Sequence, residues 1–241
     1  KKAKPYSARC DPGSPGCPRG ERSTSATSRP APALRLVKTT EINRDQWLEV
    51  RRSGIGSSDA AAAVGLNPYK SQLELWMEKT GRDDLFAPID VNDDSTPVYW
   101  GSLLEPIVAA SYAKRTGNRV RKVNAVLQHP DHPWMLANLD REVVGVPEVQ
   151  ILECKTAGVQ GARLWKDGVP DFVHLHVAHQ LAVTGKRAAD VAVLARDASI
   201  AAAGPLYATE AAGRAAVGSH GGRSSRQRRR CGEHKGRGSQ A

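Results

Sequence analysis

Two apolar segments of the sequence, residues 135–144 and 149–155, alternate between apolar and polar side chains in the way that β-strands do. The short connection at 146–148 contains a proline and suits a turn between antiparallel strands. Because successive side chains of a strand point to opposite faces, Glu153 and Lys155 should lie on the same face. The sequence therefore predicts a β-pair that presents an acid and a base to a common ligand.

The same pairing would bring Asp140 alongside Glu153. Paired acidic oxygens suit a hard cation such as Mg²⁺, and a lysine beside them can orient or deprotonate a water molecule. Phosphodiester hydrolysis requires such a set. However, an Asp followed by Glu-x-Lys on a strand is also typical of an ordinary solvated sheet edge, so the interpretation depends on the rest of the chain.

Further motifs flank these residues at 47–60, 65–69, 73–76, 100–106 and 179–185. In this order around Asp140 and the Glu153-x-Lys155 pair, they resemble the YqaJ-like viral recombinase family. That family is the phage-type alkaline exonuclease group related to lambda exonuclease, within the PD-(D/E)xK nuclease superfamily. The resemblance covers about residues 44–194. It implies an α/β fold with a restriction-endonuclease-like core, in which helices flank a central mixed sheet.

The resemblance also implies roles for individual residues. The catalytic residues would be Glu105, Asp140, Glu153, Lys155 and Gln180. Asp140 and Glu153 would bind the metal together with the backbone carbonyl of Cys154, Glu105 would support the metal site from a helix, and Lys155 would position the attacking water. Cys154 departs from the apolar residue that is usual there, but only its carbonyl would be used.

Arg51 and Ser58 match positions at which relatives hold a terminal 5′-phosphate. From the residues alone, the glycine-containing segment 54–58 precedes an alanine-rich helix at 59–64. A helix start presents unpaired backbone N–H groups that favour a phosphate, and an arginine adds a fork-shaped donor. Such a segment is more often a simple helix cap, and beside a nuclease centre it becomes a candidate 5′-end pocket.

Two helices can be expected from local signals. The segment 71–74 reads as a capping box that opens a helix ending at Gly81. The segment 99–116 has helical apolar spacing and ends at Gly117, a usual helix stop signal. Glu105 falls near the apolar stripe of this second helix, where an unpaired carboxylate is unfavourable; the alternative is a place on its solvated face.

The clustered histidines His174, His176 and His179 invite a zinc interpretation. On a helix, however, these positions spread around the surface instead of converging. The segment 129–133 is better interpreted as a turn that follows a strand at 119–128. The four cysteines show no paired CxxC spacing, which argues against a zinc site and a disulfide framework.

Composition divides the chain into a basic N-terminal tail at 1–38, a nuclease domain at 39–195 and an atypical basic tail at 196–241. The first tail is rich in Pro, Gly, Ser and Arg, and we expect it to be disordered. The excess charge lies in the flanks: residues 1–38 carry +7, residues 190–241 carry +5, and the remaining residues carry −2. The basic pI is therefore no proof of a DNA-binding surface on the domain itself.

The last tail departs from the family, whose members continue with a strand and a long amphipathic helix. A shifted or degraded reading frame near residue 195 would explain the change to Ala, Gly, Ser and Arg. The sequence contains no apolar run that could span a membrane and no secretory segment. We therefore expect a cytoplasmic protein without a membrane partner.

The sequence thus predicts a Mg²⁺-dependent deoxyribonuclease, with Mn²⁺ as the alternative ion. By resemblance it would be a 5′-to-3′ exonuclease that acts on double-stranded DNA ends in phage-type recombination, partnered by a single-strand annealing protein and assembled as a homo-oligomeric ring. One alternative is an endonuclease of the same fold. Another is a catalytically dead nucleic-acid-binding protein, against which the complete set of acids and lysine argues.

Overall fold

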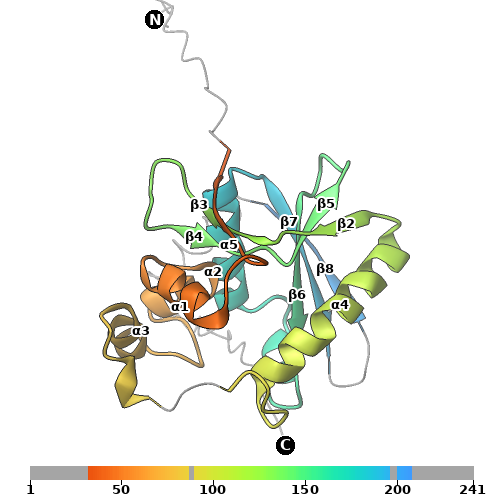
Figure 1. The fold of residues 1–241 in the computed structure, drawn as a ribbon. Coiled ribbons are helices and arrows are strands. Elements are labelled where there is room, and N and C mark those ends of the chain that lie inside the picture. The colour runs from red at the N-terminus through yellow and green to blue at the C-terminus, as the bar shows by residue number, and fades with distance from the viewer. Residues whose placement is uncertain (1–31, 87–89, 196–199, 208–241) are drawn as a thin grey trace, which may run out of the picture. The chain divides into compact units, whose positions relative to one another are not determined.

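The computed structural model describes residues 32–86, 90–195 and 200–207 (Figure 1). Its contacts divide the chain into two units, Lys1–Pro30 and Ala31–Ala241, and the described residues all belong to the second. The expected disorder of the N-terminal tail and the proposed frame change near residue 195 concern residues that lie largely outside these ranges.

The main sheet has five strands in the order β2-β5-β6-β7-β8. Their bounds are Arg119–Lys122, Arg141–Val144, Ile151–Thr156, Ala188–Leu194 and Ile200–Tyr207. β6 and β7 are parallel, whereas the other neighbouring strands are antiparallel. A parallel pair needs a crossover connection, and helix α5 (Asp171–Thr184) lies in that connection. The sheet is therefore mixed and flanked by helices, as the predicted fold class requires.

A second sheet contains three strands in the order β1-β3-β4, with bounds Leu34–Lys38, Ala125–Gln128 and Leu136–Ala137. The prediction of continuous strands at 119–128 and 135–144 was wrong, because both segments are interrupted. The chain passes between the two sheets at residues 123–124 and again at 138–140. Asp140 thus lies at the break immediately before β5. The predicted turn at 129–133 does connect two antiparallel strands, β3 and β4.

The helices follow the local signals in the sequence. Helix α3 (Gln72–Lys79) begins with a complete capping box, in which Ser71 and Glu74 each accept the other's backbone N–H. Helix α4 (Pro97–Thr116) ends at Gly117, whose φ of 75° is left-handed and suits glycine. The remaining helical elements are α1 (Arg44–Arg52), α2 (Ser57–Ala63), η1 (Asp83–Leu85) and η2 (Gly161–Trp165).

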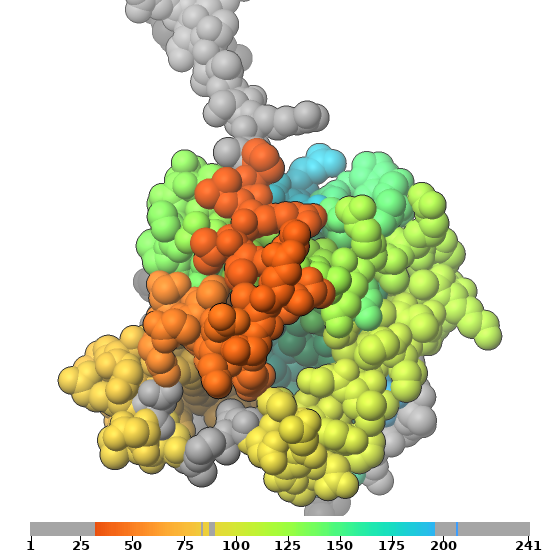
Figure 2. All heavy atoms as spheres, viewed as in Figure 1, coloured from red at the N-terminus to blue at the C-terminus, as the bar shows by residue number. Residues whose placement is uncertain are grey.

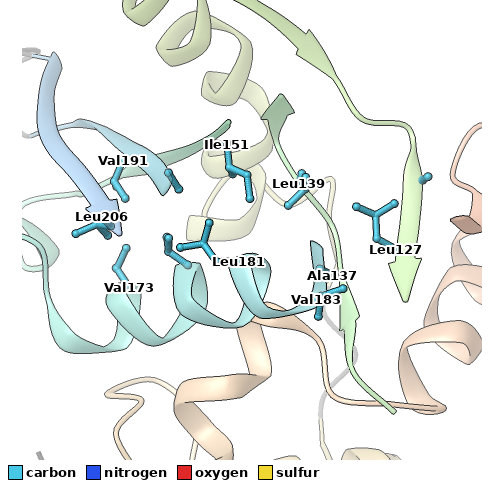
Figure 3. Packing of buried hydrophobic residues seen from close by; sticks show 12 residues of the cluster. Leu127, Ala137, Leu139, Ile151, Val173, Leu181, Val183, Val191 and Leu206 are labelled. Carbon is cyan, nitrogen blue, oxygen red and sulfur yellow. The ribbon is translucent and has the colours of Figure 1, made fainter. Parts of the chain in front are cut away.

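Helices α4 and α5 cover opposite faces of the main sheet. Val108 and Tyr112 of α4 pack against Leu152 of β6. On the other face, Ile151 of β6 packs in a cluster with Leu181 and other apolar residues of α5 (Figure 3). Because side chains alternate along β6, Glu153 must face the α5 side, as Ile151 does. The period of the strand thus delivers a buried acid to the interface with α5.

Strands β1 and β8 lie in segments that composition had assigned to the tails. Four register pairs join β1 to β3, and β8 pairs antiparallel with β7 along the edge of the main sheet. Backbone pairing with an existing strand can order a segment whose own composition is uninformative.

Among the described segments, no helix combines the length and the apolar character that crossing a bilayer demands.

Candidate active site

A cavity of about 350 Å³ lies between helices α1 and α4 and reaches strand β6. In Figure 2 a hollow separates the orange α1 segment from the yellow-green α4 segment. Seven of the eight residues that the sequence singled out line this cavity: Arg51, Ser58, Glu105, Asp140, Glu153, Cys154 and Lys155. The eighth, Gln180, is buried directly behind it and contacts Glu153. The structure therefore gathers the whole predicted set in one place.

Asp140 and Glu153 are joined through the backbone of β6. The N–H of Cys154 donates a hydrogen bond of 2.8 Å to Oδ2 of Asp140. The side chain of Cys154 packs in the apolar cluster beneath α4, so its backbone is what meets Asp140. An acid at a break between two sheets is thereby fixed beside the strand that carries the second acid.

Glu153 is 2% exposed and has three side-chain partners. Lys155 Nζ lies 2.6 Å from Oε1, as expected for two residues on one face of the strand. Gln180 Nε2 of α5 donates to Oε2 at 2.7 Å, and His176 Nε2 lies 3.0 Å from Oε1. A buried carboxylate needs such partners, because an unpaired buried charge is strongly unfavourable.

The pKa values of the two acids are shifted in opposite directions. Burial, together with the neighbouring Glu153 charge, raises the pKa of Asp140 to about 7. Burial also opposes ionisation of Glu153, but His176 and Lys155 outweigh it and hold the pKa of that carboxyl well below its usual range. Burial lowers the pKa of His176, whereas for Lys155 the opposing effect of burial is outweighed by Glu153 and Asp140, which raise its pKa.

The raised pKa of Asp140 indicates that a cation would fit between these residues. Two carboxylates held close together in a buried place repel each other, and a divalent cation would stabilise both in the charged form. No three His, Cys, Asp or Glu side chains within the described ranges are gathered so as to enclose a metal ion by themselves. Mg²⁺ is usually held by only one or two carboxylates together with water and substrate phosphate, so the pair Asp140 and Glu153 suits it.

Glu105 reaches the cavity from α4 and forms an ion pair with Arg141. The same guanidinium donates to the backbone carbonyl of Asp140 at 2.6 Å. Arg141 is 8% exposed, so this contact joins α4, the break at Asp140 and β5 within the protein interior. Glu105 is therefore paired and not simply solvated, and Arg141 links its carboxylate to the backbone of Asp140.

Arg51 and Ser58 also meet, as their expected shared role requires. Arg51 Nη2 donates to Ser58 Oγ at 2.9 Å and to Asp59 Oδ1 at 3.0 Å. Arg51 extends from the end of α1, and Ser58 lies in the first turn of α2. The loop at 53–56 connects α1 to α2, so that residues of both helices line the cavity.

Two residues in or near the site were not anticipated. His176 contacts Glu153 and lines the cavity, although the histidines were considered only as a zinc cluster. Its spacing of four residues from Gln180 places both on one helix face, and this was the available signal. Asp59 is 1% exposed and lies behind Arg51. In the sequence it stands between two serines and a run of alanines, and this pattern did not indicate a role in the site.

Comparison with known sequences identifies a family and two relatives. The YqaJ-like viral recombinase domain matches residues 46–187. The uncharacterized protein YqaJ of Bacillus subtilis (strain 168) is 44% identical over 151 residues, which are 62% of this chain and 45% of that protein. Protein D345L of African swine fever virus (strain Badajoz 1971 Vero-adapted) is 37% identical over 75 residues, or 31% of this chain and 20% of that protein. The chain spans less than half of the length of these curated relatives.

Comparison with solved structures finds the same fold. The crystal structure of an alkaline exonuclease, LHK-Exo, from Laribacter hongkongensis superposes with a TM-score of 0.54 at 19% identity, covering 72% of this chain and 91% of that one. The structure of LHK-Exo in complex with dAMP gives the same values. The domain match, the relatives and the shared fold together show that this chain belongs to the YqaJ-like viral recombinase family.

Proposed function

We propose that this protein is a metal-dependent deoxyribonuclease that hydrolyses phosphodiester bonds at double-stranded DNA ends, in the 5′-to-3′ direction. The observation that carries the proposal is the convergence of Asp140, Glu153 and Lys155 on one cavity that Arg51 and Ser58 also line. The membership of the family and the alkaline exonuclease fold support the same activity.

The residues of the cavity can divide the chemistry between them. A bound Mg²⁺, or Mn²⁺ in its place, would supply Lewis-acid stabilisation of the charge that develops on the phosphate oxygens. Asp140 and Glu153 would hold the ion, with the carbonyl of Cys154 as a further ligand. Gln180 and His176 would keep the Glu153 carboxylate in place. Lys155, raised in pKa and therefore protonated, would hold and orient the attacking water by a charged hydrogen bond.

A preference for DNA ends follows from the position of Arg51. Its guanidinium is a permanently charged, planar donor that favours a phosphate oxygen, and its contacts to Ser58 and Asp59 through Nη2 leave other N–H groups for such a ligand. Arg51 and Ser58 lie in the same cavity as the candidate catalytic residues. A terminal 5′-phosphate bound there would place a nearby phosphodiester against Asp140 and Glu153.

The decisive experiment is release of acid-soluble nucleotides from linear duplex DNA, with Mg²⁺ and with chelator. We expect release that requires the metal and that is lost in Glu153→Ala. Glu142→Ala is the matched control, because Glu142 is also ion-paired, with Arg121 and Lys186, but does not line this cavity. Equal DNA binding without cleavage by the wild type and by Glu153→Ala would contradict the proposal and favour a non-catalytic binder.

Substrate form separates exonuclease from endonuclease activity. Linear DNA should be degraded, whereas closed circular DNA should remain intact; nicking of the circle would favour the endonuclease alternative. Labels placed at the 5′ or the 3′ end report the direction of digestion. A ring-shaped homo-oligomer and a single-strand annealing partner belong to the same proposal, and mass measurement in solution with and without DNA tests the first of these.

A further inference from the structure

The carboxylate of Asp59 is buried behind Arg51 and gathers basic side chains from helices α1 and α3 and from the loop that precedes α3. Its oxygens lie 3.0 Å from Arg51 Nη2, 2.8 Å from Lys79 Nζ and 3.6 Å from Lys70 Nζ. It also accepts the backbone N–H of Gly56 at 3.1 Å. Asp59 does not itself line the cavity, so any effect that it has on a ligand must act through one of these partners.

Among the basic partners of Asp59, Arg51 lines the cavity, and it is held at several points. Nη2 is shared between Asp59 and Ser58, and the guanidinium stacks over the Trp47 ring at 5.0 Å from the ring centroid. Lys79 Nζ donates to the backbone carbonyl of Arg51 at 2.8 Å. In the described part of the chain, Nε and Nη1 of Arg51 make no hydrogen bond, so the anchored guanidinium keeps donors for a ligand.

Ser57 gives an independent indication of a ligand at the same wall. The residue is 4% exposed, and its hydroxyl has no hydrogen-bond partner among the described residues. Ser57 lines the cavity beside Ser58 and Arg51. A buried hydroxyl without a partner is unfavourable by the full desolvation penalty of that group. An acceptor that enters the cavity would remove this penalty.

We propose that Asp59 is a positioning residue that fixes Arg51 for recognition of the terminal phosphate of a DNA 5′ end, and that the Ser57 hydroxyl is a further donor to that phosphate. The inference rests on the proposed function and extends it to residues outside the predicted set. A terminal phosphate monoester carries more negative charge than an internal diester and offers three acceptor oxygens. A fixed guanidinium with two neighbouring hydroxyls matches those oxygens, whereas a 5′-hydroxyl end offers a single uncharged oxygen.

The test compares duplexes that differ only in a 5′-phosphate or a 5′-hydroxyl. Two quantities are measured for each: kcat/KM with Mg²⁺, and affinity by fluorescence anisotropy with Ca²⁺ in place of Mg²⁺. We expect the wild type to favour the phosphorylated end. Asp59→Asn and Ser57→Ala should each reduce that preference about tenfold, the scale of one hydrogen bond to a charged group, and leave the 5′-hydroxyl substrate unaffected. Glu142→Gln, an equal charge change outside the cavity, should retain the full preference.

A general loss of structure would lower activity on both ends equally and would overturn the positioning role of Asp59. Should Asp59→Asn fail to fold, Asp59→Glu decides: it keeps the charge but displaces the carboxylate from the Arg51 guanidinium by the length of a methylene, and an unchanged preference overturns the proposal. An unchanged preference in Ser57→Ala overturns the donor role of the hydroxyl.

The wild-type results separate this inference from the proposed function. Metal-dependent digestion at equal rates from both ends overturns the phosphate pocket and leaves the nuclease intact. Preferential binding of phosphorylated ends without any digestion supports the phosphate pocket and overturns the nuclease activity.

Discussion

Gln180 Nε2 donates a hydrogen bond of 2.7 Å to Oε2 of Glu153, and so ties helix α5 to the strand that carries the central acid. His176, one turn earlier on the same helix, lies 3.0 Å from the other carboxylate oxygen. The amide also donates to the backbone carbonyl of Asn138 at 3.1 Å, close to Asp140. The Gln180 side chain thus connects Glu153 to the segment that leads to Asp140, the other candidate metal ligand.

We expect Gln180→Leu to weaken binding of the metal, because Glu153 would lose the donor that orients it. Loss of such an outer partner typically lowers metal affinity or activity about 10- to 100-fold. Isothermal titration with Mn²⁺ measures the affinity directly. Gln160→Leu is the control, since Gln160 is exposed and its side chain caps no helix. Equal Mn²⁺ affinity in the Gln180 variant and the wild type would contradict the role.

Lys155→Met should retain DNA binding and lose cleavage. The variant removes the charged donor that lies 2.6 Å from Glu153 and that we assign to the attacking water. Loss of a group that handles a proton or water in the transition state lowers rates by about 10² to 10⁴. Single-turnover digestion measures this rate, and Lys186→Met is the control, because Lys186 is also paired with a glutamate but lies outside the cavity. A rate within a few-fold of the wild type would exclude Lys155 from the chemistry.

The sequence sufficed to predict those parts of the site that depend on local periodicity. The alternation of β6 correctly placed Glu153 and Lys155 on one face, and the stop at Gly117 correctly ended the helix that carries Glu105. In each case the relevant neighbours are few residues apart, so the local backbone geometry determines the outcome.

The parts that could not be predicted depend on contacts between distant segments. The burial of Asp59 requires Lys79 of α3 to approach α2, and the place of His176 requires knowledge of which face of α5 packs on β6. The break at Asp140 arises because the chain changes from one sheet to the other, whereas its alternation pattern continues without interruption. Periodicity within one segment carries no information about such changes of partner.

Leu181 offers a test of the packing that holds α5 against the sheet. Its side chain is 1% exposed and belongs to the cluster with Ile151 and Val191 (Figure 3). Leu181→Ala should lower the free energy of unfolding by about 2–5 kcal/mol, because the lost methyl groups leave a cavity. Leu73→Ala, at a position that is 64% exposed, should change it by less than about 0.5 kcal/mol. Urea unfolding of both variants checks the contrast, and similar losses would contradict the assigned core.

The dependence of stability on pH should reveal the charged state of Asp59. Burial opposes its ionisation, but Arg51 and Lys79 outweigh burial and hold the pKa of Asp59 below its ordinary value. The folded protein therefore binds this proton less readily than the unfolded chain does, so the charge contributes stability that is complete above the unfolded pKa of about 3.9 and is lost as pH falls through the folded pKa. Asp59→Asn cannot titrate.

The difference in unfolding free energy between the wild type and Asp59→Asn should accordingly be constant from about pH 7 to about pH 5 and should shrink below about pH 4. Urea unfolding of both proteins at a series of pH values measures it. A difference that stays constant through the acid range would mean that Asp59 is not held in its charged form by its basic partners, and its proposed hold on Arg51 would lose its electrostatic basis.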